Sequence, residues 1–340
     1  MRGTTLLLTM LFGFAAPSEW AMAASEGDVL DGAERQRIIE AFAGLERTRN
    51  LLVTVDGRPV LEHVADGLPL GRPANVKSVA KTVISALVGA AIERGVIEGT
   101  DQPVVALLGE HVPSDTDPRV AEITVGHLLS MQAGLQRTSG RNYGAWVTSD
   151  DWVGYALSRP FVAEPGGRML YSTGNSHILS AALTHASGRS TLELARAWLG
   201  APLDIRVPAW DTDPQGIYFG GNNMRLSARA LTRIGALYLR GGTHDGERVL
   251  APGWVEASWA RRTRSRYTGD AYGYGWFTTE LAGESVHYAW GYGGQFLYVI
   301  PRLDLTLVLL SDPTPPSPQS ALVRRVHAVI ERELIPAVRE

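Results

Sequence analysis

The 340-residue sequence predicts an α+β protein of the α/β sandwich type, and three observations support this prediction. Strand patterns occur near the start of the chain, at residues 51–64, and again near its end, at residues 271–311. Helical patterns fill most of the middle, from about residue 100 to 215. We therefore expect one antiparallel sheet built from both chain ends and flanked by helices, with a mostly helical subdomain inserted between them.

The first 23 residues have the layout of a secretory signal. Arg2 precedes an apolar run from Leu6 to Ala16, and Ala21-Met22-Ala23 forms a small-x-small cleavage site. The run is too short to span a bilayer, so we expect an exported protein, periplasmic or secreted, with no stable membrane insertion after cleavage. A disordered or membrane-tethering N-terminus is the alternative. Residues 24–340 should form the folded domain.

Local patterns define the elements of the N-terminal part. Residues 27–48 carry the apolar spacing of a helix. Two β-rich runs within residues 51–64 flank Asp56-Gly57, a strong hairpin signal. After a loop rich in glycine and proline, residues 78–97 form a long apolar helix that ends at glycines.

The remaining elements follow the same rules. Helices are predicted at residues 123–135, 176–188, 191–200, 224–242 and 321–338. Four short aromatic and β-branched runs predict strands at residues 271–280, 284–292, 295–301 and 305–311.

Composition excludes several functional classes. The net charge of −3 and the absence of a basic stripe give no reason to expect a nucleic-acid partner. There is no cysteine, and the eight histidines are scattered without a metal-binding spacing, so no metal or cofactor is expected. His127 and His177 are interpreted as structural histidines on helices.

Lysine usage points to the chemistry. The chain contains 30 arginines but only two lysines, Lys77 and Lys81, and both flank Ser78. Ser78 and Lys81 are three residues apart, so a helix places them on one face. A serine hydroxyl needs a base to become a nucleophile, and a buried lysine can lose its proton whereas arginine cannot. A capping serine beside a snorkelling lysine is the structural alternative, and Lys77 has no role that its position explains.

Longer motifs extend this pattern. Ser78-Val79-Ala80-Lys81 resembles the S-x-x-K motif of penicillin-recognising serine hydrolases. Residues 123–135 (ITVGHLLSMQAGL), 165–175 (PGGRMLYSTGN), 224–242 and 289–301 are similar, in order, to further motifs of one branch. That branch contains class C β-lactamases, DD-peptidases, family VIII-type esterases and 6-aminohexanoate-dimer hydrolases. The resemblance covers about residues 50–315 and implies a β-lactamase/transpeptidase-like fold.

The resemblance also implies roles for individual residues. Ser78 would be the nucleophile, and Lys81 and Tyr171 would relay protons, with Tyr171 as the direct base toward Ser78 or the leaving group. Because an ordinary phenol has a pKa near 10, this role needs help from Lys81. The oxyanion hole would combine the N–H groups of Ser78 and Tyr292, just after Gly291. These residues should converge at one cleft.

Two motifs depart from the pattern of the branch. The family's Y-x-N tyrosine motif would place asparagine at position 173, but the chain has Thr173, with Asn175 two residues later. The third motif reads Ala289-Trp290-Gly291, without the cation that receives a β-lactam carboxylate. The tryptophan at position 290 resembles the esterase and nylon-oligomer-hydrolase members instead, and both departures weaken the β-lactamase interpretation without affecting Ser78, Lys81 or Tyr171. We expect Thr173, Asn175, Trp290, Gly291 and Tyr292 to line the substrate site.

The expected function is that of an exported serine hydrolase that acts through an acyl-enzyme on a small-molecule or peptide-like ester or amide. A β-lactamase or DD-carboxypeptidase is the alternative within this class. A penicillin- or peptidoglycan-binding module without turnover is the alternative from another class. The sequence leaves the acyl group, the leaving group and the oligomeric state open.

Overall fold

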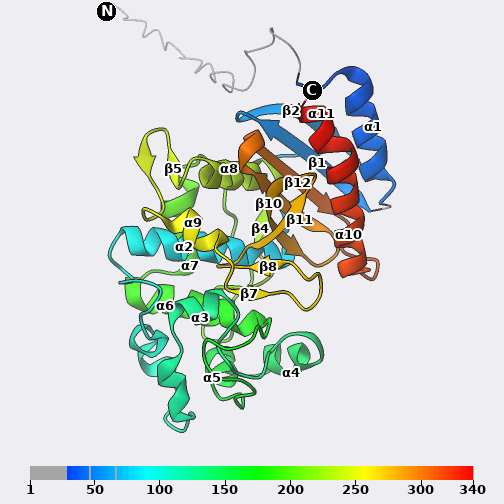
Figure 1. Ribbon diagram of the computed structural model, residues 1–340. Helices are drawn as coiled ribbons and strands as arrows, with labels where there is room; N and C mark the ends of the chain where they lie inside the picture. The colour runs from blue at the N-terminus through cyan, green and yellow to red at the C-terminus, as the bar shows by residue number, and fades with distance from the viewer. Residues whose placement is uncertain (1–28, 46, 66, 340) are drawn as a thin grey trace, which may run out of the picture.

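A computed structural model describes residues 29–339 apart from 46 and 66, so the predicted signal at 1–23 lies outside the described residues. An eight-stranded antiparallel sheet, in the order β2-β1-β12-β11-β10-β9-β8-β7, forms the centre (Figure 1). The strands are β1 (Thr48–Val55), β2 (Arg58–Val64), β7 (Thr263–Arg264), β8 (Ala271–Tyr272), β9 (Phe277–Leu281), β10 (Glu284–Gly291), β11 (Gln295–Ile300) and β12 (Leu305–Ser311). Two small two-stranded antiparallel sheets pair β3 (Ala74–Asn75) with β4 (Arg225–Leu226) and β5 (Thr243–His244) with β6 (Glu247–Arg248).

Helices cover the sheet and form the inserted region. The α-helices are α1 (Gly32–Ala43), α2 (Ala80–Glu93), α3 (Val125–Leu129), α4 (Tyr143–Val147), α5 (Trp152–Leu157), α6 (Thr173–Ser187), α7 (Thr191–Leu194), α8 (Ala228–Leu239), α9 (Trp254–Trp259), α10 (Ser320–Val329) and α11 (Ile335–Arg339). A 3₁₀ turn, η2 (Lys77–Val79), precedes α2, and π-helical turns η7 (Ala195–Gly200) and η9 (Ile330–Leu334) extend α7 and α10. None of the helices in the described part of the chain is long and apolar enough to cross a membrane.

The two chain ends meet in the sheet, as the sequence predicts. β1 pairs with β12, and Leu51 lies opposite Leu309. The β1–β2 hairpin turns at Asp56 and Gly57, whose φ angles of 50° and 73° are those of the tight turn predicted there. The α+β prediction is therefore confirmed.

Alternation along the strands builds two cores. On β1, Leu52 packs with α2 and α8, whereas Leu51 and Val53 pack with α1 and α10 on the other face. Figure 1 shows α1, α10 and α11 on one side of the sheet and α8 on the other. The sheet is therefore buried on both faces, as in a sandwich of helices around one sheet.

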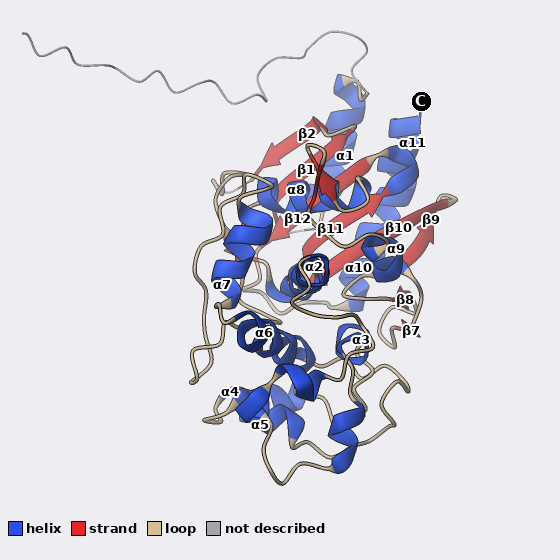
Figure 2. Ribbon diagram, turned by 90° about the vertical axis from the view of Figure 1, so that its left-hand side faces the viewer, coloured by secondary structure: helices blue, strands red, loops and turns tan. Residues whose placement is uncertain are grey.

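The inserted helical region lies against one end of the sheet, with α2 between the two parts (Figure 2). Every residue of α2 from Ala80 to Ala91 is buried. The sequence overestimates some helices here: the helix predicted at 123–135 ends at Leu129, because Met131 takes a φ of +63° and turns the chain away. The 78–97 helix begins with η2 instead of a regular turn.

Candidate active site

Ser78 lies in the 3₁₀ turn η2, immediately before α2. Its predecessor Lys77 has a φ of +52°, a left-handed conformation that costs a side-chain-bearing residue about 1 kcal/mol. The side chain of Asn75 stabilises this turn, because its Oδ1 accepts the Lys77 N–H at 2.9 Å. The turn leaves Ser78 partly exposed at the entrance to a buried helix.

Lys81 lies one turn further along, with its Nζ 3.0 Å from Ser78 Oγ. Its Nζ also donates to the carbonyl oxygen of Gly221 at 2.6 Å. The side chain is only 3% exposed, and burial lowers the pKa of Lys81 from 10.5 to about 7. The serine therefore contacts an amine that loses its proton near neutral pH.

Tyr171 approaches the same pair from the segment before α6. Lys81 Nζ lies 5.2 Å from the centroid of the Tyr171 ring. Burial raises the pKa of the Tyr171 phenol above its usual value of 10, and a side-chain hydrogen bond with Ser78 only partly opposes this shift. The phenol is thus a proton donor at neutral pH, placed beside both Ser78 and Lys81.

The end of β10 reaches the η2 turn that carries Ser78. A Cβ on Gly291 would lie 2.5 Å from the carbonyl oxygen of Val76 and 3.0 Å from the Cβ of Lys77, so a larger residue could not pack here. Trp290 is partly buried. Tyr292 is 48% exposed, and its hydroxyl accepts a hydrogen bond from the Ser317 N–H.

Thr173 and Asn175 have different surroundings in the structure. Thr173 is buried beside the Lys81 anchor, because a Cβ on Gly221 would lie 2.7 Å from its Cγ2. Its hydroxyl is hydrogen-bonded to Ser139 Oγ at 2.9 Å. Asn175 is buried inside α6, and its Nδ2 finds no hydrogen-bond partner among the described residues.

Sequence reasoning missed three contributors to this region. One is Gly221, which anchors Lys81; its signal is the Gly220-Gly221 pair just before two asparagines. The others are Tyr267, whose phenol acts electrostatically on Tyr171, and Arg137, whose Nη1 donates to the Tyr267 hydroxyl. Tyr267 is exposed, and nothing in its sequence context links it to Tyr171.

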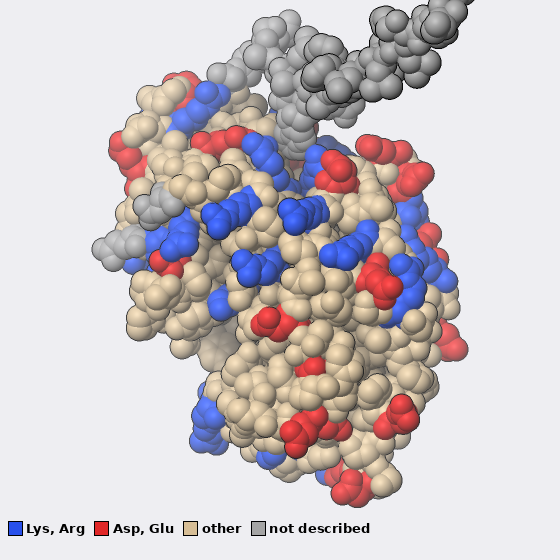
Figure 3. Space-filling model, turned by 180° about the vertical axis from the view of Figure 1, so that it is seen from behind, with Lys and Arg blue, Asp and Glu red and all other residues tan. Residues whose placement is uncertain are grey.

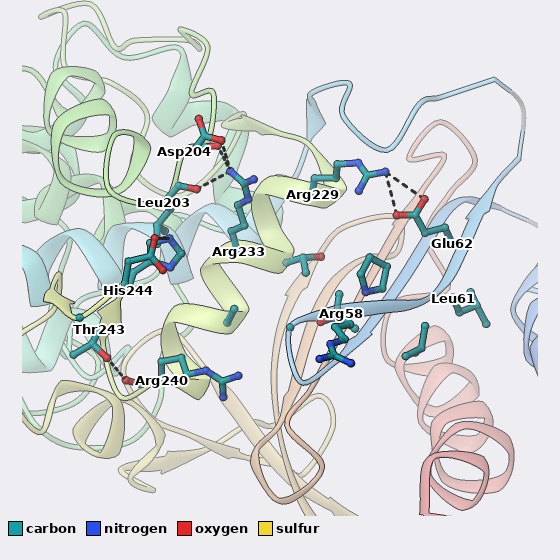
Figure 4. A pocket seen from close by; sticks show the side chains of 18 of the residues that line it. Arg58, Leu61, Glu62, Leu203, Asp204, Arg229, Arg233, Arg240, Thr243 and His244 are labelled. Carbon is teal, nitrogen blue, oxygen red and sulfur yellow. Dashed lines mark hydrogen bonds and ion pairs between the residues drawn. The ribbon is translucent and has the colours of Figure 1, made fainter. Parts of the chain in front are cut away.

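A large cavity lies elsewhere, between α8 and β2, with a volume of about 1170 Å³ (Figure 4). Arginines line it, and Arg229 and Arg233 form ion pairs with Glu62 and Asp204 at 3.0 and 2.9 Å. Figure 3 shows arginine-rich and acid-rich areas on one face of the molecule. Its lining contains no serine, lysine or tyrosine, so this cavity, the arginine cavity, lacks the serine–lysine–tyrosine set found around Ser78.

The described residues contain no group of three or more histidine or acidic side chains placed to hold a metal ion. The groups that the Ser78 site offers for chemistry are the serine, the lysine, the tyrosine and the backbone around them.

Comparisons with known proteins agree with the fold. The Beta-lactamase family model matches residues 38–330. A 6-aminohexanoate-dimer hydrolase from Paenarthrobacter ureafaciens is 28% identical over 267 residues; the match covers 69% of this chain and 65% of that relative, just under two thirds of its length.

Solved structures share the fold at low sequence identity. An octameric penicillin-binding protein homologue from Pyrococcus abyssi superposes with a TM-score of 0.69 at 18% identity, covering 89% of this chain and 78% of that one. EstCE1, a hydrolase with promiscuous acyltransferase activity, superposes with a TM-score of 0.69 at 18% identity. The match covers 89% of this chain and 98% of EstCE1. Since the family model spans most of the chain, the protein belongs to the Beta-lactamase family.

Proposed function

We propose that this protein is an exported serine hydrolase that cleaves an ester or amide through an acyl-enzyme on Ser78. The observation that carries the proposal is the 3.0 Å contact between Ser78 Oγ and the amine of Lys81, whose pKa burial lowers to about 7. A base whose pKa lies near the working pH is well suited to proton transfer. Export rests on the signal-like sequence of the first 23 residues.

In the acylation step, Lys81 accepts the Ser78 proton while Oγ forms a bond to the substrate carbonyl carbon. We assign this base role to Lys81 and not to Tyr171, because the raised pKa keeps the Tyr171 phenol protonated. Tyr171 then gives its proton to the leaving oxygen or nitrogen as that bond breaks. The ammonium of Lys81 returns a proton to Tyr171, so the pair ends the step as it began.

The oxyanion of the tetrahedral intermediate would be received by the N–H of Ser78 and by an N–H at the end of β10, next to Gly291. The close approach of Gly291 to Val76 supports this assignment, since it places the strand end beside the nucleophile turn. Deacylation reverses the relay: a water gives its proton to the Lys81–Tyr171 pair and attacks the acyl carbon. Ser78 leaves with a proton from Lys81.

Two observations favour an esterase or amidase over a β-lactamase or DD-carboxypeptidase. Position 289 in the third motif is a buried alanine and offers no cation to a substrate carboxylate. The curated relative is named for an amide dimer, and a structural neighbour is a hydrolase with acyltransferase activity.

A substrate panel tests this function. It contains short-chain p-nitrophenyl esters, 6-aminohexanoate-type amides, nitrocefin and D-Ala-D-Ala peptides, each incubated with wild type and with Ser78→Ala. We expect steady turnover of at least one ester or amide, lost in Ser78→Ala. A single stoichiometric burst without turnover would favour a binding module instead, and turnover of nitrocefin alone would favour a β-lactamase.

A further inference from the structure

A buried histidine–aspartate pair lies behind the Lys81 anchor and has no part in the chemistry proposed above. His177 Nε2 lies 2.9 Å from an Asp213 carboxylate oxygen, and both side chains are completely inaccessible. Aromatic rings surround the imidazole, with the ring centroids of Trp152 and Phe219 at 5.4 and 5.8 Å. A buried polar pair in an apolar shell is costly unless every group is satisfied.

The Asp213 carboxylate organises the loop that follows it. Its Oδ1 accepts the backbone N–H groups of Gln215 and Ile217 at 2.9 and 2.8 Å. These bonds fold the loop back on itself. Because the carboxylate oxygens act as hydrogen-bond acceptors, His177 Nε2 must supply the hydrogen in its contact with Asp213. The pair thus fixes one imidazole tautomer, with a lone pair on Nδ1.

That lone pair faces the backbone of the same loop at Gly220. His177 Nδ1 accepts the Gly220 N–H at 3.5 Å, and the next residue, Gly221, supplies the carbonyl that receives Lys81 Nζ. The loop lies against α6 so closely that a Cβ on Gly220 would be 2.1 Å from the Ser176 carbonyl oxygen. The orientation of the Gly221 carbonyl therefore depends on a backbone that His177 holds.

The same loop also supports the nucleophile. Asn75, whose side chain holds the Lys77 N–H, donates to Asn223 Oδ1 at 3.1 Å, and the Val76 N–H donates to the Met224 carbonyl at 3.0 Å. One loop thus contacts both the turn that carries Ser78 and the amine of Lys81.

We infer that the His177–Asp213 pair is a positioning pair for Lys81, acting through the backbone of Gly220 and Gly221; this inference rests on the base role proposed for Lys81. A carbonyl acceptor stabilises the ammonium more than the free amine. Misplacing the Gly221 carbonyl therefore lowers the basicity of Lys81 and moves its amine relative to Ser78. Neither histidine nor aspartate touches the substrate in this account.

Two substitutions at the same position separate the link to Gly220 from the ion pair. His177→Asn keeps an acceptor where Nδ1 lies but loses the donor to Asp213, and His177→Gln keeps a donor to Asp213 but loses the acceptor for Gly220. We expect kcat for a p-nitrophenyl ester to fall at least tenfold in His177→Gln, with KM within twofold of wild type. His177→Asn should keep most of kcat although it melts at a lower temperature.

Ser180→Ala is the matched control, because Ser180 Oγ donates to the Tyr218 carbonyl and joins the same helix to the same loop without reaching Gly221. We expect it to lower thermal stability and leave kcat unchanged. If kcat follows melting temperature across the three variants, or if Ser180→Ala loses as much activity as His177→Gln, the positioning role is refuted.

A readout that does not need turnover keeps this inference separate from the proposed function. The chain has only two lysines, so protein labelled with ¹³Cε-lysine gives two NMR signals, and the signal lost in Lys77→Arg belongs to Lys77. His177→Gln should lower the pH midpoint of the Lys81 signal by at least 0.5 unit, and an unchanged midpoint overturns the inference even if no substrate is hydrolysed. If His177→Gln does not fold, Asp213→Asn replaces it with the same expected shift, because an amide that donates to Nε2 moves the imidazole hydrogen to Nδ1, which then cannot accept the Gly220 N–H.

Discussion

The Ser78 site and the arginine cavity both contain cationic side chains, yet they differ in what those side chains can do. In the arginine cavity, Arg229 and Arg233 form ion pairs with Glu62 and Asp204. At the Ser78 site, a single buried lysine contacts a serine hydroxyl and a backbone carbonyl.

The difference shows that an arginine in an ion pair and a buried lysine offer different chemistry. An arginine stays protonated in proteins, so the arginines of the cavity cannot act as bases. Burial gives Lys81 a pKa of about 7, and this makes it able to accept a proton at neutral pH. In a chain with 30 arginines, the residue that must lose its proton is one of the two lysines.

The largest effect should come from the Ser78–Lys81 contact. We expect Ser78→Ala to lower kcat/KM for the best ester at least ~10⁴-fold, since it removes the atom that forms the acyl bond. Lys81→Arg should lower it ~10³-fold or more, because a guanidinium keeps the charge but cannot accept the proton. Steady-state kinetics on both variants measure this, and substantial activity in Lys81→Arg would refute the base argument.

Tyr171→Phe should have an effect that depends on the leaving group. Loss of the phenol proton should slow amide hydrolysis by ~10²- to 10⁴-fold, because an amine must be protonated as it leaves. A p-nitrophenyl ester needs no such help, so its rate should fall much less. Equal losses on matched amide and p-nitrophenyl ester substrates would contradict the donor role.

Burial of Lys81 should also appear in the pH dependence of stability. Between pH 7 and about 10.5, the unfolded chain keeps a proton on Lys81 that the folded protein has lost, so the free energy of unfolding rises with pH. Relative to Lys81→Met, the wild type should gain about 1.4 kcal/mol per pH unit across this range. Urea denaturation of both proteins at pH 7, 8 and 9 measures the slope, and parallel curves would count against a buried neutral amine.

The smallest effect should come from the arginine cavity. Arg229→Gln removes an ion pair whose side chains are 41% and 38% exposed, so it should cost at most about 1 kcal/mol of stability. Ester hydrolysis should stay within twofold of wild type. A tenfold loss of kcat in this variant would mean that the arginine cavity contributes to the reaction after all.

Local patterns predicted most of the sheet and the chemistry at Ser78. The Asp56-Gly57 turn and the aromatic and β-branched runs of the C-terminal strands are local features, so the sequence contains them. The i, i+3 spacing of Ser78 and Lys81 is equally local. The family resemblance, and not the spacing, singled out Tyr171.

The rest of the site depends on contacts between distant segments. Gly221 meets Lys81 across 140 residues, and no local pattern marks its carbonyl as an anchor. The sequence pattern indicates only a structural histidine at His177. Its link to Gly220 exists because the loop folds back onto α6. The early end of the helix predicted at 123–135 has a similar origin, since the left-handed Met131 is fixed by tertiary packing and not by its neighbours.

The central claim is that Lys81 is a neutral amine beside Ser78 near physiological pH, and a direct titration tests it. Wild-type protein labelled with ¹³Cε-lysine gives two lysine signals, which Lys77→Arg assigns. The account predicts that the Lys81 signal changes with a midpoint of about pH 7. A Lys81 midpoint near the ordinary value of 10.5 would contradict it, because the lysine would then be a permanent cation and could not activate Ser78.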